Sequence, residues 1–450
     1  MYNNTSRLIV PSLAVASLLL LCGCGGAGSN FTTPTTVSAA TITPVAGSGT
    51  NTTPTAGGGT GQGTGGAPST SGSGSPAAAQ SVPGYSQLMA LPFQAGITHT
   101  DGRYGFTGGN FLIEGAQKIL DLGSPAIFLY MTPNFRTGYP DRGAGMWPAS
   151  NPVSLTELAQ TLPYQKVFNM PFQTIVITAY GMANGDDINK IYSDPSAAAA
   201  EEKEFYDFAR YLYSTYAGTG KTFVLKHWEG DFIALNGYHP ELEIDQHTID
   251  VMVTWLKARQ RGVARARQDA GNPSGIGVFH AVECSLVLDF ARGVKKSRVI
   301  NTVVPQVAPD MVTYSSWDST LQGTDAASAS AATKEALDAI KRVAPDPLGL
   351  GNRRILISEY GLMERSRPTE TVWRAQAILE ASKSAGILGA FYWELFDNEC
   401  TDASGNYFPA GSLPSDPVRP ANANCDGLSI VRPDGSTSPA LAVVASYWKH

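Results

Sequence analysis

The feature that most constrains the fold is an alternation of short apolar runs with longer helical stretches, repeated eight times after Gly84. Each run is too short for a helix and is rich in β-branched or aromatic residues, as buried parallel strands are. Parallel strands need crossover connections, and eight of them close a sheet without an edge. The sequence therefore predicts a (β/α)8 TIM barrel. The expected strands are 94–99, 126–131, 173–179, 222–229, 275–283, 311–314, 353–359 and 389–394.

The competing architecture is an open, doubly wound sheet. It is disfavoured because no Gly-rich phosphate turn follows the first strand, and because polar or aromatic residues end nearly every strand instead of gathering at one switch point. Pro368 is expected to open the last long helix and Gly386 to stop it. The other expected helices are 111–122, 197–216, 244–270 and 331–343.

The first 83 residues read as an export and anchoring segment. Residues 1–23 carry Arg7 and an apolar run that is short for a membrane span, as in a signal peptide. The end of this run resembles a bacterial lipobox, which implies that Cys24 carries the lipid. Residues 24–83 form a Gly/Ser/Thr/Pro/Ala-rich stretch without any Lys, Arg, Asp or Glu, which predicts a disordered tether. A plain signal peptide is the alternative.

Residues 84–450 are expected to form one catalytic domain, since no second linker follows. The formal net charge is −6, and no Lys/Arg block is present. A mildly acidic surface argues against nucleic acid and anionic lipid as partners, so membrane association would come from the lipid anchor only. We expect a monomer without a cofactor.

The remaining cysteines divide into a pair and a single residue. Cys400 and Cys425 share one Gly/Pro/Asn-rich segment of a chain expected to be exported, which predicts a disulfide. Cys284 has apolar neighbours and is expected to be a small buried core residue, not a nucleophile.

Carboxylates and aromatic residues gather where the expected strands end. Hydrolysis of a glycosidic bond needs one carboxylic acid to protonate the leaving oxygen and one carboxylate to attack or to activate water. Aromatic rings offer apolar faces to sugar rings. The predicted catalytic carboxylates are Glu229, Glu283 and Glu359, and the predicted substrate-binding residues are His99, Tyr180, His227, Trp228, His280, Tyr314, Trp317, Trp393 and Glu394.

The segment Ile357-Ser358-Glu359-Tyr360-Gly361 resembles strand seven of the clan of retaining (β/α)8-barrel glycoside hydrolases, clan A. The resemblance implies that Glu359 is the nucleophile and that Glu229, ending strand four, is the acid/base. It also implies that Tyr314 hydrogen-bonds the nucleophile and that Trp393 floors the sugar site. The chain departs from the clan at Trp228, where an Asn usually precedes the acid.

Several other roles stay open for the acidic residues. Glu283 is the rival acid/base, and Asp231 could orient the acid or belong to an ordinary turn. Glu359 could instead be an ion-pair partner of Arg353 or Arg365. Glu394 precedes Leu395 in an apolar run, which favours a contact with a substrate hydroxyl.

A metal site is not expected. His99, His227 and His280 lack the His-x-His and His-x-x-x-His spacings, so hydrogen bonding to sugar or core packing is favoured. A calcium site at residues 397–402 is disfavoured because the EF-hand spacing is absent, and a solvated loop containing Asp397, Glu399 and Asp402 is expected instead.

Together these features predict an exported, lipid-anchored glycoside hydrolase of the bacterial cell envelope. It would cleave glycosidic bonds in a polysaccharide or oligosaccharide by a retaining double displacement. The alternatives are a non-catalytic carbohydrate-binding surface lipoprotein on the same scaffold and a metal-dependent hydrolase.

Overall fold

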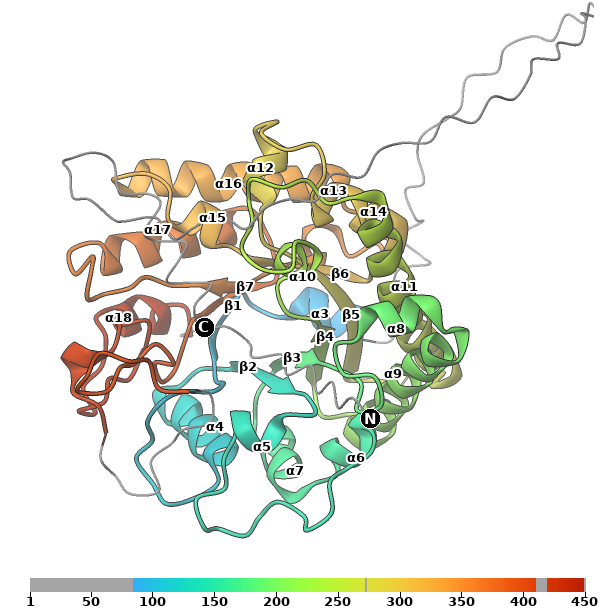
Figure 1. Ribbon diagram of the computed structural model, residues 1–450, viewed down its shortest axis with the longest axis horizontal. Helices are drawn as coiled ribbons and strands as arrows, with labels where there is room; N and C mark the ends of the chain where they lie inside the picture. Colours follow the sequence, from blue (N-terminus) through green and yellow to red (C-terminus); the bar gives the residue numbers. More distant parts are fainter. Residues whose placement is uncertain (1–83, 272, 410–418, 449–450) are drawn as a thin grey trace, which may run out of the picture.

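The chain folds into a closed barrel of eight parallel strands in sequence order, with helices around it (Figure 1). The computed structural model describes residues 84–271, 273–409 and 419–448. The expected signal peptide, Cys24 and the tether lie outside the described residues. The strands are β1 (Gln94–Thr98), β2 (Ala126–Met131), β3 (Thr174–Ala179), β4 (Lys221–Lys226), β5 (Ile276–Cys284), β6 (Met311–Ser315), β7 (Ile355–Tyr360) and β8 (Gly389–Tyr392).

The predicted (β/α)8 barrel is confirmed, and β1 pairs with β8 to close the sheet. Strand four differs most from its expected range, because β4 ends at Lys226 and residues 227–229 form a loop into the next helix. Pro368 does not open a helix; α17 begins at Thr371. The helices between the strands begin and end close to the expected positions elsewhere.

Local capping explains why the long helices start where they do. The Asn110 side chain accepts from Ile113 N at the start of α4, and Gly123, at φ 100°, ends that helix. Asp325 and Ser328 form a capping box before α16, which offsets the unpaired amides of its first turn. The helices are α3 (Tyr85–Ala90), α4 (Phe111–Leu122), α5 (Phe135–Gly138), α6 (Leu155–Ala159), α7 (Leu162–Asn169), α8 (Ile188–Ser193), α9 (Pro195–Tyr216), α10 (Gly230–Ala234), α11 (Gln246–Asp269), α12 (Val287–Ala291), α13 (Val299–Thr302), α14 (Val304–Val307), α15 (Trp317–Thr320), α16 (Ala326–Val343), α17 (Thr371–Ser384) and α18 (Ala440–Ala445), with short 3₁₀ turns at Gly351–Arg354 and Asn422–Asn424.

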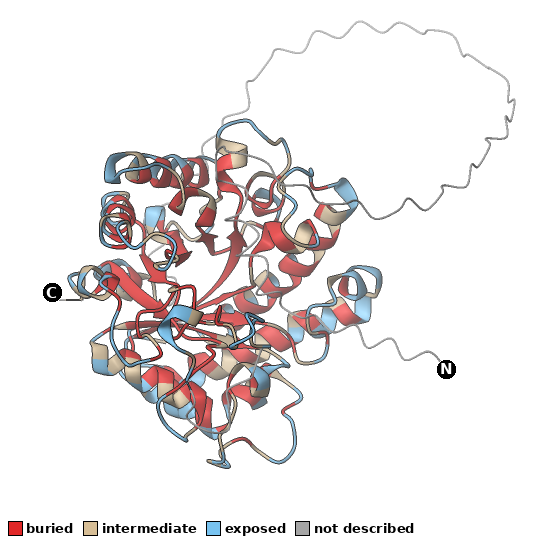
Figure 2. Ribbon diagram, turned by 60° about the vertical axis from the view of Figure 1, so that its left-hand side comes forward, coloured by how far each residue is buried: buried red, intermediate tan, exposed pale blue. Residues whose placement is uncertain are grey.

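The core has two layers, because alternate residues of each strand point to opposite sides of the sheet. One set fills the barrel and the other packs under the helices, so the strands are buried on both faces (Figure 2). Leu88 of α3 joins the barrel-filling set. That set includes Phe128, Val176, Val224, Phe279, Leu356 and Phe391.

Candidate active site

Three glutamates meet at the carboxyl end of the barrel. Glu283 near the end of β5 accepts a 2.6 Å hydrogen bond at Oε2 from the backbone N–H of Glu229. Glu229 precedes α10 and has φ 20°, a conformation that a non-glycine residue rarely adopts. The Glu283 carboxylate therefore fixes the strained turn that presents Glu229.

A bulge in β7 aims Glu359 into the same space. Tyr314 pairs with Ile357, but Ser315 pairs with Glu359, so Ser358 of β7 has no partner residue on β6. Such a bulge lets two successive side chains point to one face. Ser358 then donates to Glu283 Oε1, while Glu359 contacts Ser315 and Trp317.

Lys226, the last residue of β4, supplies the positive charge of the site. Its Nζ lies 2.6 Å from Glu283 Oε1 and 3.9 Å from Glu359 Oε1, and it sits 4.3 Å from the centre of the Phe128 ring. Neither Arg353 nor Arg365 serves Glu359: Arg353 donates to backbone carbonyls of residues 88 and 91, and Arg365 faces Asp426.

Glu283 is enclosed by these partners. Its oxygens accept from Lys226, Glu229 N and Ser358, Thr313 Oγ1 lies 3.4 Å away, and its side chain is fully buried. A carboxylate held in this way is suited to orienting others, so its position disfavours the acid/base role that was left open for it.

Ser315, at the end of β6, joins the other two carboxylates. Its Oγ lies 2.7 Å from Glu229 Oε1 and 3.0 Å from Glu359 Oε2. Trp317 Nε1 donates to the same Glu359 oxygen at 3.2 Å. Since both contact one atom, Glu229 Oε1 and Glu359 Oε2 lie no more than about 6 Å apart.

Burial and mutual repulsion act on both carboxyl groups. Burial first, and then the charge of Glu359, raises the pKa of Glu229 well above its usual range. Burial and the charge of Glu283 raise the pKa of Glu359 to about 7, while Lys226, Trp317 and Ser315 oppose the rise. Burial and like charge thus make both groups hold a proton more firmly than an exposed glutamate does.

The prediction of a hydrogen bond from Tyr314 to Glu359 is wrong. Tyr314 lies on the outer face of β6 and donates to Asp318, because residues 311, 313 and 315 are the ones that face the barrel interior. Ser315 and Trp317 take the place that the resemblance had given to the tyrosine.

The three histidines also face the helices and are fully buried. His99 donates to Phe111 O at 2.8 Å, and His280 donates to Gln260 at 3.0 Å. His227 Nδ1 donates to Trp228 O, which leaves Nε2 to accept from Glu283 N at 3.1 Å. Burial lowers the pKa of each ring, to about 4 for His99.

Direct sugar contacts are therefore excluded for His99 and His280 in this conformation, and His227 holds the backbone of Glu283.

Two partly accessible aromatic side chains lie near Glu229. Tyr180 and Trp228 are half-buried, and the Tyr180 hydroxyl accepts from Trp228 N at 3.3 Å. Tyr180 stacks on Trp255 of α11, with ring centres 6.1 Å apart. Trp317 and Trp393 are buried among the barrel-filling side chains, and a substrate-binding role for these four residues stays a prediction.

Glu394 follows β8 and is fully buried. Its Oε1 accepts from Asn398 N at 2.9 Å, and burial with the nearby charge of Asp397 raises its pKa well above the usual range. A direct contact with a substrate hydroxyl would need this carboxyl group to be uncovered.

A cleft of about 180 Å³ opens beside Glu229. Glu229, Ser315 and Trp317 line it, together with Phe232 and Tyr238. A larger cavity of about 410 Å³ lies beside α4, and none of the three clustered glutamates lines it. Of these two cavities, the cleft is therefore the one that borders the glutamate cluster.

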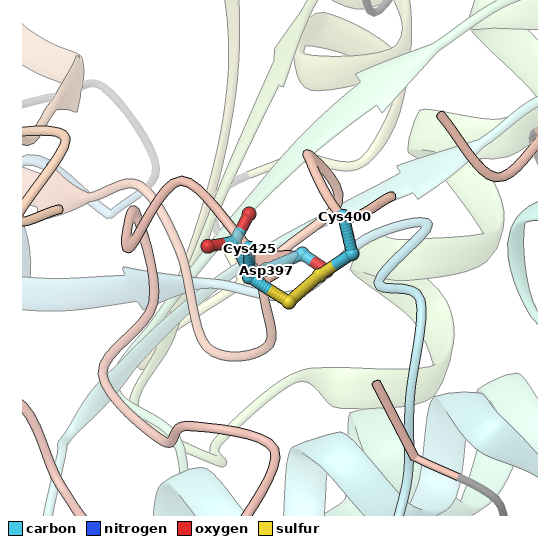
Figure 3. A group of neighbouring side chains, drawn as sticks. All are labelled: Asp397, Cys400 and Cys425. Carbon is cyan, nitrogen blue, oxygen red and sulfur yellow. A yellow bond between two sulfur atoms is a disulfide. The ribbon is translucent and has the colours of Figure 1, made fainter. Parts of the chain in front are cut away.

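The predicted disulfide between Cys400 and Cys425 is confirmed, and Cys284 is a buried free cysteine as expected. Asp397 lies next to the disulfide (Figure 3). Its oxygens accept backbone N–H groups of residues 399, 427 and 428, and the two sulfurs are bonded to each other, so this group is not a metal site.

The prediction of a solvated loop at residues 397–402 is wrong in part. Asp397 and Glu399 are buried, whereas Asp402 is at the surface and accepts from Ser404 N and Asn406 N. Asp231 is also buried and accepts from the backbone of residues 285, 286 and 299, so it fixes the loops beside Glu229 instead of touching its carboxyl group.

Sequence reasoning missed two members of the site, Lys226 and Ser315. Lys226 carried a signal, since a lysine inside an apolar strand must find a buried partner. For Ser315 the only signal in the sequence was its position, two residues after Thr313 and therefore on the same face of β6.

No family model matches the chain, and no curated protein matches it. Among solved structures, it resembles a GH5_18 protein of Streptomyces cattleya in complex with Manb1-4GlcNAc, with 14% identity and a TM-score of 0.46, covering 75% of this chain and 74% of that chain. Similar values hold for the exo-beta-1,4-mannosidase Op5Man5 of Opitutaceae bacterium strain TAV5 (15% identity, TM-score 0.46, 75% and 55% coverage) and for ZgEngAGH5_4 in complex with a cellotriose (14%, 0.45, 82% and 98%). At such low similarity the function has to be argued from the carboxylates themselves.

Proposed function

We propose that the protein is a glycoside hydrolase that cleaves glycosidic bonds in a polysaccharide or oligosaccharide with retention of configuration. The observation that carries the proposal is the placement of two buried carboxyl groups, Glu229 and Glu359, on the single hydroxyl of Ser315. Carboxyl groups about 5 to 5.5 Å apart suit direct attack by one of them on the anomeric carbon. The limit of about 6 Å between the two oxygens that share Ser315 supports this shorter spacing over the roughly 6.5 to 9.5 Å of an inverting pair.

The two environments support different roles for the two groups. Glu229 holds its proton and acts as the acid on the leaving oxygen, then as the base on the incoming water. Glu359 lies near Lys226 and accepts from Trp317 and Ser315, so it is the group more easily ionised and acts as the nucleophile.

The cleft on the Glu229 side would receive the leaving part of the substrate. Tyr180 and Trp228 supply half-buried ring surface near the acid, which suits the apolar face of a sugar. In this proposal the enzyme is exported and held on the bacterial cell envelope through lipid on Cys24, where extracellular or periplasmic glycans are within reach.

One observation favours the rival function, a non-catalytic carbohydrate-binding lipoprotein. Glu229 and Glu359 are only 1% and 2% exposed, so neighbouring side chains cover both carboxyl groups. The rival predicts saccharide binding in the cleft without product formation.

The test is incubation with a panel of activated 2-deoxy-2-fluoro glycosides followed by peptide mass spectrometry. These reagents form the glycosyl–enzyme bond but hydrolyse slowly. An adduct on Glu359 is expected, together with turnover of the matching unmodified glycoside. Binding of saccharide without adduct or turnover across the panel would support the rival.

The companion variant is Glu359→Ala, which should lower kcat by roughly 10,000-fold or more because the nucleophile is removed. Saccharide binding should persist. Glu399→Gln is a matched control, since Glu399 is also a buried carboxyl group but has Asp397 and Asp426 as its charged neighbours. An active Glu359→Ala enzyme would refute the nucleophile assignment.

A further inference from the structure

The Ser315 hydroxyl makes two short contacts but carries one hydrogen. Its Oγ is 2.7 Å from Glu229 Oε1 and 3.0 Å from Glu359 Oε2, and the residue is fully buried. A hydroxyl can donate to only one of two carboxylates. Both contacts are hydrogen bonds only when one carboxyl group is protonated and donates to the serine, while the serine donates to the other.

The surroundings decide which group holds the proton. Glu359 Oε2 also accepts from Trp317 Nε1, and Lys226 Nζ lies 3.9 Å from Glu359 Oε1. Among the described residues, Ser315 is the only hydrogen-bond partner of the Glu229 carboxyl group, whose Oε2 is buried and unpaired. The negative charge is therefore better placed on Glu359, and the hydrogen bonds run from Glu229 to Ser315 to Glu359.

The pattern of unpaired atoms also identifies the reacting oxygens. Neither Glu229 Oε2 nor Glu359 Oε1 accepts a hydrogen bond from the described residues. An oxygen that must form a bond to carbon, or exchange a proton with substrate, has to be free of fixed donors. Glu359 Oε1 is then the attacking atom. Glu229 Oε2 marks the side of the carboxyl group that faces the leaving oxygen, and a half-turn about the Cγ–Cδ bond brings the protonated oxygen to that side.

From this geometry we propose that Ser315 is a positioning residue whose hydroxyl hydrogen changes acceptor during the catalytic cycle. It donates to Glu359 before attack and to Glu229 once the glycosyl–enzyme has formed. The inference rests on the proposed glycosidase function and deepens it, because it assigns a specific partner to each half of the reaction.

The proton count balances in both halves. In the first, the Glu229 carboxyl group makes this half-turn and gives its proton to the leaving oxygen, the glycosidic C–O bond breaks, and Glu359 Oε1 bonds to the anomeric carbon. Glu359 is then an uncharged ester and Glu229 an anion, so the better acceptor for Ser315 is now Glu229. In the second half, water gives a proton to Glu229 and its oxygen to the anomeric carbon, the ester bond breaks, and Ser315 turns back to the Glu359 anion.

The test compares Ser315→Ala with the wild-type chain and with Ser382→Ala. Ser382 is a fully buried serine on α17 and serves as the matched control for loss of a buried hydroxyl. Ser315→Thr keeps a hydroxyl at the same position. The measurement is kcat/KM against pH on a glycoside that the wild-type enzyme turns over, with thermal unfolding to confirm that each variant is folded.

Ser315→Ala should lower kcat/KM by about 10- to 100-fold, as expected for one charge-assisted hydrogen bond. The acidic limb of its profile should move to higher pH, because the Glu359 anion loses a donor. Ser315→Thr should return that limb toward the wild-type position, and Ser382→Ala should leave it in place.

A folded Ser315→Ala enzyme with an unmoved acidic limb would overturn the inference, whether or not its rate falls, because a purely structural role lowers the rate at every pH alike. An unmoved limb in Ser315→Ala together with normal kcat/KM would do so more strongly. Wild-type turnover is established first, so a chain that cleaves no glycoside refutes the proposed function and not the role of the serine alone.

Discussion

Glu229 sits in a backbone conformation that its own side chain does not favour. A non-glycine residue at positive φ costs of order 1–3 kcal/mol and persists only where the surroundings fix it. Here Glu283 accepts from Glu229 N at 2.6 Å, and the Glu229 carbonyl accepts from residues 232 and 233 of α10. Glu283 is in turn held by Lys226. Glu229 is thus positioned by a charge network on β4 and β5.

The opposed environments of Glu229 and Glu359 predict a bell-shaped dependence of kcat/KM on pH. Glu359 must be ionised to attack, and its pKa is raised to about 7, so activity should fall as the pH drops below about 7. Glu229 must be protonated, and burial with the charge of Glu359 raises its pKa well above the usual range, so an alkaline limb should appear where Glu229 loses its proton. Initial rates across pH 4 to 10 measure both limbs.

A profile that is flat from pH 4 to 7 would contradict this assignment of charge. Replacing Glu229 by Gln should remove the alkaline limb, because no acid is left to deprotonate. The loss should be smallest for substrates whose leaving group needs no protonation, which separates the acid from the nucleophile.

Lys226 is predicted to matter for stability as well as for charge. Lys226→Met removes one partner of a buried ion pair and leaves the Glu283 charge uncompensated, which typically costs about 3–5 kcal/mol. It should also move the acidic limb to higher pH, because Lys226 lowers the pKa of Glu359. Urea unfolding gives the first quantity.

Lys203→Met is the matched control for this change. Lys203 pairs with Asp207 on the surface of α9, and an exposed pair of this kind contributes less than about 1 kcal/mol. Equal unfolding midpoints for the two variants would contradict a buried, paired Lys226.

At the level of strands, the sequence predicted the barrel correctly but misplaced several side chains, because alternate residues of a strand face opposite sides of the sheet. Apolar runs and crossover helices were enough to predict the barrel, since both are local patterns. The face on which a residue lies follows from counting along the strand, and Thr313 and Ser315 face inward where Tyr314 cannot. His99 and His280 fall on the outward count in the same way.

The bulge in β7 is the exception that counting would not find. Strict alternation would send Glu359 outward, because Ser358 already points into the barrel. The irregular pairing of Ser315 with Glu359 brings both inward. A bulge depends on how a neighbouring strand pairs, so the position of Glu359 at the end of a strand could be predicted from the sequence, but its inward direction could not.

The loop after β8 is expected to depend on its disulfide. The bridge joins Cys400 to Cys425 across 25 residues, and a loop of that size is worth about 3 kcal/mol. A Cys400→Ser/Cys425→Ser double variant should therefore melt several degrees lower than the oxidised wild type in thermal unfolding followed by circular dichroism.

Reductant provides the control for that experiment. Dithiothreitol should lower the melting temperature of the wild type toward that of the double variant and leave the variant unchanged. A double variant that melts with the oxidised wild type would show that the backbone pairing of residues 400 and 425 holds the loop without the bridge.

The whole molecule combines a closed barrel with a covered site. The first described helix, α3, places Leu88 in the barrel-filling cluster, and Arg353 donates to carbonyls at residues 88 and 91 of this segment. Across the part of the chain that the structure describes, no helix has the length and hydropathy to span a membrane.

The proposed anchor on Cys24 and the proposed site lie in different parts of the chain. We therefore predict that anchoring and catalysis can be separated. A chain beginning at Gly84 keeps α3, all eight strands and the three clustered glutamates, so it should fold and match the full-length kcat/KM on a soluble glycoside. In a bacterial host, full-length protein should partition with membranes, and Cys24→Ser should release it by removing the lipid attachment point. Fractionation with activity assays measures both effects. A Cys24→Ser protein that stays with the membrane would refute the anchor, and an unfolded fragment from Gly84 would show that the preceding residues contribute to the barrel.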